Sequence, residues 1–589
     1  MNNETMQPEN TQESPAFPPL SSARSELFTR MPLSIVLPSA AAGATATTIA
    51  IALDAAIWVA LGIGVGIAML GGARMRKTNI WRILGMRGSL WWRNRRGTGS
   101  GPRTEPFDVD IPESGGARCG MRWDGSHLIT MIGLDRTTVR PTLLSSAQIQ
   151  AGSAISLADV ARCLSQFDIR LAAVDVVTLG VRTQGPHNVV RLYESLLGPL
   201  PAAATQSVWL VLRFDPLDNV DAIDNRGSAQ EGVIRTALVA TRRVAGRLAT
   251  RGVRVSVLTA SELAAAEAAV LHDTDPQQWT EDWRILRGSG IELAGYAVRP
   301  HRLEPEVLAA VWALPGKSVL TRLRMTPAVE SDSPGRRGNV VALTAVVRHD
   351  LAGVGHHDTE QPSAELGLHP LRGLQRRVLL DGGHLAPSAA LCGVPAAMSR
   401  FTVPAAGCGQ VIGANSDGLG VAVPLFGPAV RRVEIVGSLR LTQLMVLRAI
   451  AVGAQVIVHS TRPREWQCLV EAVDAPAALS LPSPGGGAQY TAAATMIVYD
   501  GIASAGQVSE ATAVHVRSPQ ESTAGLLGAD VALIESTDVP GRVIIRSAGE
   551  ELAVRVVSIP GEAEYLDGAQ PAPVETETES EAEPALQSA

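Results

Sequence analysis

Four aspartates recur at three-residue intervals in one short stretch. The sequence "DPLDNVDAIDN" places Asp215, Asp218, Asp221 and Asp224 directly after an apolar run that is typical of a β-strand. Loops that follow strands commonly present ligands in α/β sheets, and hard divalent cations bind clustered carboxylates. The spacing matches neither an EF-hand nor a DxD triplet. The stretch therefore indicates either a metal site or a solvated acidic loop before a helix, and the acidic loop is the favoured interpretation.

A second group of possible metal ligands lies further along the chain. His356, His357, Asp358 and Glu360 offer nitrogen and oxygen donors. They stand in a Gly-rich stretch, however, and no second cluster of such residues accompanies them. An exposed polar loop is the favoured interpretation.

Three glycines in "AAGCGQVIGAN" (405–415) resemble a phosphate-binding loop. The stretch lacks both the GK[ST] ending and the preceding strand and following helix that such a loop requires. We expect Gly409 and Gly413 to serve turns or close packing, and no histidine is spaced to activate Cys408.

The cysteines and the overall charge exclude several functional classes. Five scattered cysteines with no CxxC pair predict reduced or buried thiols: Cys119, Cys163, Cys392, Cys408 and Cys468. The length of 589 residues indicates more than one domain, and a formal net charge of -6 gives no reason to expect nucleic-acid binding along the whole chain. We therefore predict no catalytic, cofactor-binding or metal-binding residue.

An almost uncharged stretch runs from Ile35 to Gly72, interrupted only by Asp54. As one helix, its roughly 38 residues would extend for about 57 Å, whereas the hydrocarbon core of a bilayer is about 30 Å thick. We expect a transmembrane hairpin over residues 31–72, with one helix over Leu33–Ala52, a tip at Asp54 and a second helix over Ala55–Gly72.

A basic segment follows over residues 73–104 and contains no acidic residue before Glu105. By the positive-inside rule, we expect the rest of the chain to lie on the cytoplasmic side of the inner membrane. Arginines and tryptophans suit the surface of an anionic bilayer, which is favoured here over a nucleic-acid patch. The expected membrane-anchoring residues are Arg74, Arg76, Lys77, Trp81, Arg82, Trp91, Trp92 and Arg93.

Two cytosolic subdomains are expected between polar tails. Residues 105–330 alternate strands with helices, which predicts an α/β subdomain over a largely parallel sheet. Its expected elements include a hairpin around Asp124-Gly125, a helix over 156–169 that begins at Ser156, and a long helix over 228–252. Residues 331–560 predict a second α/β subdomain with a β-rich end. The polar residues 1–30 and the acidic residues 561–589 are expected to be disordered tails.

Several long stretches resemble one known family. They are "CGMRWDGSHLITMI", "LADVARCLSQFDIRLAAVDVVTLGVRT", the region from "LRFDPLDN" to "LTASEL", "CGQVIGANSDGLGVAVPL" and "LTQLMVLRAIAVGAQVIVHSTRPREW". Together with the apolar stretch and the Arg/Trp segment, they resemble EccE, a core membrane component of mycobacterial type VII (ESX) secretion systems. The resemblance covers roughly residues 30–560 and leaves both tails outside it.

The resemblance implies a non-catalytic structural subunit of an inner-membrane complex built with EccB, the ATPase EccC and EccD for protein export. It also implies a glycosyltransferase-like α/β fold, no cofactor and no catalytic residue that transfers to this sequence. The absence of a Walker motif means that this subunit is not expected to power transport itself. Two alternatives stay open: a membrane-anchored glycosyltransferase-like enzyme with a divalent metal at the acidic loop, and a membrane-tethered scaffold outside secretion.

Overall fold

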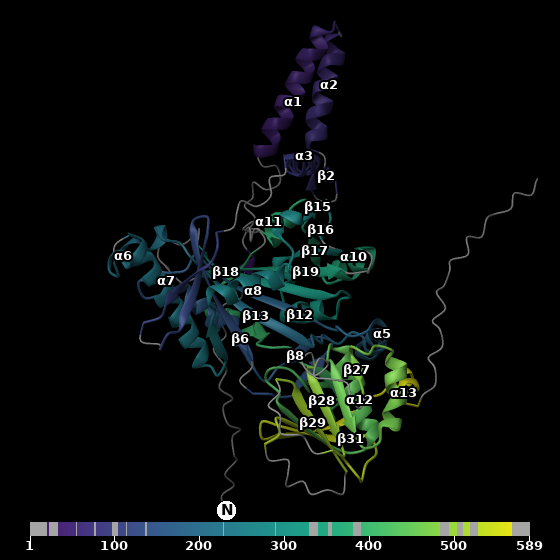
Figure 1. Cartoon of the computed structure of the whole chain (residues 1–589). Coiled ribbons are helices and arrows are strands. Elements are labelled where there is room, and N and C mark those ends of the chain that lie inside the picture. The colour runs from purple at the N-terminus through teal and green to yellow at the C-terminus, as the bar shows by residue number, and fades with distance from the viewer. Residues whose placement is uncertain are drawn as a thin grey trace, which may run out of the picture. The chain divides into compact units, whose positions relative to one another are not determined.

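The computed structural model describes most of the chain and divides it into two compact units (Figure 1). Unit 1 comprises Met1–Arg182 and Pro199–Cys408, and unit 2 comprises Thr183–Gly198 and Gly409–Ala589. The described residues are 21–22, 33–54, 56–72, 74–75, 78–96, 104–112, 115–135, 138–227, 229–288, 290–328, 340–351, 356–380, 390–482, 494–502, 510–518 and 528–567.

Two helices occupy the uncharged stretch, α1 (Leu33–Ala52) and α2 (Ile57–Gly72), and they lie side by side (Figure 1). The turn between them includes Asp54 at a φ of 56°. A Cβ atom on Gly64 of α2 would lie only 1.9 Å from the hydroxyl of Thr47 and 2.8 Å from the carbonyl oxygen of Gly43 in α1. The helices therefore approach closely because Gly64 has no side chain.

The prediction of a transmembrane hairpin is wrong. Among the described residues, no helix is both long enough and apolar enough to cross a bilayer. The 20 residues of α1 include many alanines and threonines, which are weakly hydrophobic. The 16 residues of α2 are more apolar, but they extend for only about 24 Å, which is shorter than a hydrocarbon core of about 30 Å.

Unit 1 is built on one extended antiparallel sheet, and its recorded strand pairs all run antiparallel. Its main path, in spatial order, is β15 (Thr280–Glu281), β16 (Leu286–Gly288), β17 (Ile291–Val298), β19 (Val340–Leu351), β18 (Ser318–Ala328), β12 (Ala173–Val181), β13 (Thr205–Phe214), β6 (His127–Asp135), β5 (Arg118–Asp124) and β4 (Phe107–Asp110). The expected parallel sheet is therefore wrong for this unit. Alternation of strands and helices does not fix strand direction here. Strands β12 and β13 pair directly and run antiparallel, although other residues separate them along the chain.

Helices cover both faces of the central strands. On one face, α7 (Ala229–Ala249) packs into the main core, where the hydroxyls of Thr130 on β6 and Thr241 on α7 lie 2.7 Å apart. On the other face, α8 (Ala260–Val270) packs Leu263 against Met131, which is the neighbour of Thr130 along β6. Successive residues of a strand point to opposite faces, so β6 contributes to both layers.

Local signals in unit 1 predicted some elements correctly. The hairpin around Asp124-Gly125 is confirmed by β5 and β6, which pair through Asp124 and His127. The hydroxyl of Ser156 accepts a hydrogen bond from the Ala158 N–H, so it is the expected N-cap. The helix that it begins is only α4 (Leu157–Ala161), however, which continues as a 3₁₀ helix over Arg162–Leu164 before the chain turns back at Phe167, where φ is 56°.

Among the described residues, the parallel strand pairs lie in unit 2. In spatial order, β27 (Leu479–Ser480), β26 (Val456–Ser460), β28 (Met496–Asp500), β29 (Thr512–Arg517), β25 (Arg432–Val436) and β30 (Val531–Glu535) run parallel, and β31 (Arg542–Ser547), β32 (Glu550–Val556), β23 (Gln410–Ala414) and β24 (Gly420–Val423) continue the sheet antiparallel. Helix α12 (Leu439–Ala451) connects β25 to β26. Strand β25, helix α12 and strand β26 therefore follow one another in βαβ order.

A buried ion pair connects α12 to the acidic end of the chain. Arg448 donates two hydrogen bonds to Glu562, at 2.8 and 2.9 Å, and it also donates to the carbonyl oxygens of Val411, Ile412 and Val557. Glu562 belongs to α14 (Pro560–Asp567). The predicted start of the disordered acidic tail, residue 561, is therefore too early, because the Glu562 carboxylate is part of this buried ion pair. Residues 568–589 lie outside the described residues, as does the tail expected over 1–30 apart from Ser21–Ser22.

The stability of unit 1 should depend on the protonation of His349. This side chain of β19 is fully buried and lies edge-on to Tyr296, with 5.6 Å between the ring centroids. Neither ring nitrogen has a hydrogen-bond partner among the described residues. Burial lowers the pKa of His349 from 6.5 to about 4, although the charge of Asp350 opposes that shift. The folded state therefore favours the neutral ring.

We predict that His349 contributes stability above pH 6.5 and that this contribution is lost as the pH falls towards 4, because the unfolded chain binds the proton first. The loss would reach roughly 3 kcal/mol. Urea unfolding of His349→Leu between pH 7 and 4 should show a shallower pH dependence than the wild type, whereas the exposed control His301→Leu should not. Equal slopes for His349→Leu and the wild type would contradict this prediction.

Candidate functional site

The four aspartates of the acidic loop do not converge. The Asp215 carboxylate accepts a hydrogen bond from the Leu217 N–H at 2.9 Å, whereas Asp218, Asp221 and Asp224 are exposed around α6 (Val220–Asp224). Within the described part of the chain, no three His, Cys, Asp or Glu side chains are grouped so that they could hold a metal ion. The described geometry agrees with a solvated loop that leads into helices.

The His356 cluster lies on a helix rather than in a loop. Helix α10 spans His356–Glu365, which corrects the loop expectation. Glu360 forms ion pairs with Arg284 at 2.9 Å and with Arg372 at 3.2 Å. The side chains of His356, His357 and Asp358 are outside the described residues, and the one described member of the cluster is neutralised by arginines.

The glycines of residues 405–415 serve close packing, as expected. A Cβ atom on Gly409, whose φ is 77°, would lie 2.2 Å from the backbone nitrogen of Pro424. A Cβ atom on Gly413 would lie 2.0 Å from the carbonyl oxygen of Arg555. The thiol of Cys408 is buried and donates to the carbonyl oxygen of Ala203 at 3.2 Å. Neighbouring backbone therefore packs directly against both glycines.

The residues expected to anchor the chain to a membrane fall mainly on one helix. Helix α3 spans Ile80–Arg96 and includes Trp81, Arg82, Trp91, Trp92 and Arg93, while Arg74 lies in β2 (Arg74–Met75). Arg76 and Lys77 lie outside the described residues, and of the side chains named here only Trp91 and Trp92 are described.

Some described side chains of α3 contact other elements of unit 1, whereas others are exposed. The guanidinium of Arg87 stacks over Trp283 at 5.2 Å from the ring centroid, and the Asn94 amide donates to the carbonyl oxygen of Glu281 at 2.9 Å. Trp91 and Trp92 are 56% and 49% exposed. One part of α3 therefore holds it to unit 1, and another presents two indole rings to the surroundings.

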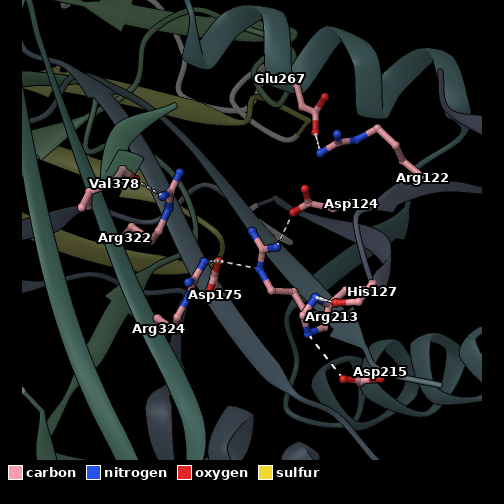
Figure 2. Close-up of polar contacts among 11 residues, drawn as sticks. Arg122, Asp124, His127, Asp175, Arg213, Asp215, Glu267, Arg322, Arg324 and Val378 are labelled. Carbon is pink, nitrogen blue, oxygen red and sulfur yellow. Dashed lines mark hydrogen bonds and ion pairs between the residues drawn. The ribbon is translucent and has the colours of Figure 1, made fainter. Parts of the chain in front are cut away.

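A cavity of about 450 Å³ in unit 1 gathers more charged side chains than any expected site does. Its floor is one face of strands β5, β6, β12, β13 and β18, and α8 and α11 (Gln375–Leu379) also line it. Its apolar wall includes Met131, Trp209 and Val211. Its charged lining residues are Arg122, Asp124, Asp175, Arg213, Glu267 and Arg322 (Figure 2).

Asp175 is the central carboxylate of this cavity. Strand register places Asp175 on β12 opposite Arg324 on β18, and Arg324 donates two hydrogen bonds to it at 2.6 and 2.7 Å. Arg213 on β13 donates a third at 3.4 Å. Burial opposes ionisation of Asp175, but the neighbouring charge of Arg324 and its hydrogen bonds outweigh burial and hold the pKa of this carboxyl at about 2.

Two further ion pairs extend the network across the cavity. Arg213 contacts Asp124 at 2.7 Å, which ties β13 to the end of β5. Arg122 on β5 contacts Glu267 on α8 at 2.7 Å, which ties the sheet to that helix (Figure 2). Because these pairs join elements that are distant in sequence, they help to fix the geometry of the cavity.

The described residues near the cavity do not form an activated nucleophile. The Ser126 hydroxyl lies 3.2 Å from His127 Nδ1, but His127 Nε2 is 3.8 Å from the Asp215 carboxylate, which is beyond hydrogen-bond distance. No third group therefore orients the imidazole as a catalytic base would require.

A second buried carboxylate, Asp350, has a purely structural arrangement. Arg348 donates to it at 2.7 and 2.8 Å, His272 Nε2 lies 2.7 Å away, and Ser318 donates its hydroxyl to the same carboxylate. The serine and the histidine both contact the carboxylate rather than each other. The cluster therefore connects β18, β19 and the end of α8 without creating a reactive group.

Sequence reasoning missed the charged cavity. One signal was present, because Asp175 is the only charged residue in the strand "AVDVVTLGV", and Arg322 and Arg324 alternate in "TRLRM". An isolated charge within a buried strand requires a partner of opposite sign. The partner strand could not be identified, since β12 and β18 are separated by more than one hundred residues and pair only through the fold.

Comparison with known proteins relates this chain to one class of protein. Residues 202–298, which run from the residues preceding β13 to the end of β17, match a family described as "Putative type VII ESX secretion system translocon, EccE". The ESX-2 secretion system protein EccE2 of Mycobacterium tuberculosis is 24% identical over 393 residues, which are 66% of this chain and 66% of that protein. The aligned part is thus just under two thirds of that relative.

Two further relatives extend the comparison. The ESX-1 protein EccE1 of Mycolicibacterium smegmatis is 25% identical over 68% of this chain and 78% of its own length. The ESX-5 protein EccE5 of Mycobacterium marinum is 29% identical over 53% of this chain and 74% of its own length. The class is thus that of ESX secretion-system proteins. The chain is similar to the EccE family over these aligned residues.

We predict that Asp175→Asn destabilises the protein by about 3 to 5 kcal/mol, because Arg324 and Arg213 would lose the buried charge that compensates them. Urea unfolding at pH 7 would measure this loss. Asp218→Asn is the matched control, since it makes the same change at an exposed loop carboxylate and should alter stability by less than about 0.5 kcal/mol. Similar stabilities for the two variants would refute the central role of Asp175.

Proposed function

We propose that the chain is a non-catalytic structural subunit of an inner-membrane type VII (ESX) secretion complex. The observation that carries this proposal is the match to proteins named for the ESX-1, ESX-2 and ESX-5 systems over 53 to 68% of the chain. Relatives in three systems indicate a component that such systems share. The subunit anchors and stabilises the complex, whose other members are EccB, EccC and EccD.

The internal use of charged groups supports a structural role. The carboxylates of Asp175, Asp350 and Glu562 are buried and bonded to arginines of neighbouring elements. Within the described residues, metal-binding side chains are not grouped. Function is then carried by surfaces rather than by a reactive centre, and the ATPase EccC supplies the energy for export.

Two surfaces of unit 1 are suited to contacts in such a complex. The exposed apolar side chains of α1 and α2, such as Ile49, Trp58 and Leu61, would be covered by neighbouring subunits. The indole rings of Trp91 and Trp92 on α3, together with the basic residues of that helix, would rest on the head groups of anionic lipids. A helix with basic and aromatic residues can bind a bilayer surface without crossing it.

A tagged copy of the full chain, extracted from cell membranes in mild detergent, should co-purify EccB, EccC and EccD. Mass spectrometry of the purified sample would identify them, and deletion of the gene should stop export of the cognate substrates. An unrelated tagged membrane protein serves as the purification control. Isolation of the tagged chain without any of these partners, together with normal export in the deletion strain, would refute the proposal.

Replacing Trp91 and Trp92 by serine should reduce binding of the full chain to vesicles that contain anionic lipid by about tenfold or more, because two indole rings would no longer enter the head-group region. Vesicle flotation would measure the bound fraction. The matched control is Trp123→Ser on β5, which removes an indole elsewhere in unit 1. Equal flotation of the double variant and the wild type would exclude these rings from lipid contact.

A further inference from the structure

Arg322 is a cation of the unit 1 cavity that has no carboxylate partner. Among the described residues, its recorded hydrogen bond is from Nη1 to the carbonyl oxygen of Val378 at 2.8 Å, and no ion pair includes it. Its Nε atom is buried without a hydrogen-bond partner. A carbonyl oxygen is neutral, so it satisfies one N–H group but does not compensate the charge.

Neighbouring carboxylates cannot take this role. Asp175 already accepts two hydrogen bonds from Arg324 and one from Arg213 (Figure 2). Arg213 also engages Asp124. Around this end of the cavity, three arginines therefore face two carboxylates, and one positive charge remains.

The electrostatic environment of Arg322 agrees with this accounting. Burial lowers its pKa to about 10, and the positive charges of Arg324, Arg213 and Arg348 act in the same direction against the attraction of Asp175. The guanidinium still carries its proton at neutral pH. A partly buried cation whose surroundings disfavour its charge in this way would be stabilised by an added anion.

The cavity has space for such an anion and for an apolar group attached to it. Its volume of about 450 Å³ is within the usual range for small-molecule sites. Beside the charged residues, Trp209, Met131 and Val211 supply an apolar wall from strands β13 and β6. A ligand that contacts both kinds of lining has an anionic group and a ring or another apolar body.

We propose that the unit 1 cavity binds a small phosphomonoester, with its phosphate against Arg322 and Arg213 and its apolar body against Trp209. A planar guanidinium can donate two parallel hydrogen bonds to phosphate oxygens, and the phosphate compensates the remaining positive charge. The indole ring offers a flat apolar surface for the body of the ligand. Binding would be structural or regulatory and does not depend on the proposed role in secretion.

Phenyl phosphate is the smallest probe that tests both kinds of lining. Saturation-transfer NMR and calorimetry with the full chain should detect saturable binding of phenyl phosphate, weaker binding of inorganic phosphate, and no binding of phenol. Arg322→Gln should weaken phenyl phosphate binding by about tenfold or more, because a charge-assisted hydrogen bond is lost. Trp209→Ala should weaken phenyl phosphate binding and leave inorganic phosphate binding unchanged.

Two controls separate ligand binding from a role in folding. Arg287→Gln removes an exposed arginine that pairs with Asp282 and Glu292, so it should leave phosphate binding unchanged. Arg322→Gln should retain the wild-type unfolding temperature without ligand but lose the increase in that temperature caused by phenyl phosphate. Absence of saturable binding to the wild type, or equal loss of binding in Arg287→Gln and Arg322→Gln, would overturn the proposal.

Discussion

Sharing of the Asp175 carboxylate by two arginines is the constraint on which the architecture of unit 1 depends. β12 is the strand between β13 and β18, and Asp175 draws one arginine from each of them towards the same point. The hydrophobic core on the opposite sheet face is not directional, whereas these hydrogen bonds select one register. A shift by one residue would move Asp175 to the apolar face and leave both guanidinium groups uncompensated.

The same arrangement explains why unit 1 contains a cavity on one side of its sheet and a close-packed core on the other. Long charged side chains hold their head groups apart, so they do not fill space as interlocking aliphatic groups do. Helix α8 spans part of this face and is held by the ion pair between Glu267 and Arg122. The open volume is therefore a product of the network that orders the strands, and Arg322 lines this volume without an ion-pair partner of its own.

Elements with local signals could be predicted, whereas their long-range pairing could not. The turn at Asp124-Gly125, the cap at Ser156 and helix α12 all follow from neighbouring residues. The direction of the unit 1 sheet depends on contacts between distant strands, and the alternation of strands and helices suggested the wrong one. The transmembrane hairpin was predicted wrongly for a different reason: an absence of charge is not equivalent to hydrophobicity in α1, and α2 is too short. The charged cavity required knowledge that β12 lies between β13 and β18.

The ion pair between Arg448 and Glu562 has a consequence for biosynthesis. Arg448 leaves the ribosome 114 residues before its partner, which corresponds to roughly 6 to 23 s at ordinary bacterial elongation rates of about 5–20 residues per second. Unit 2 also needs the Tyr193 hydroxyl, which accepts a hydrogen bond from the Val411 N–H across 218 positions. Helix α12 must therefore wait for α14, and the nascent chain carries an unfinished interior until Glu562 has been translated.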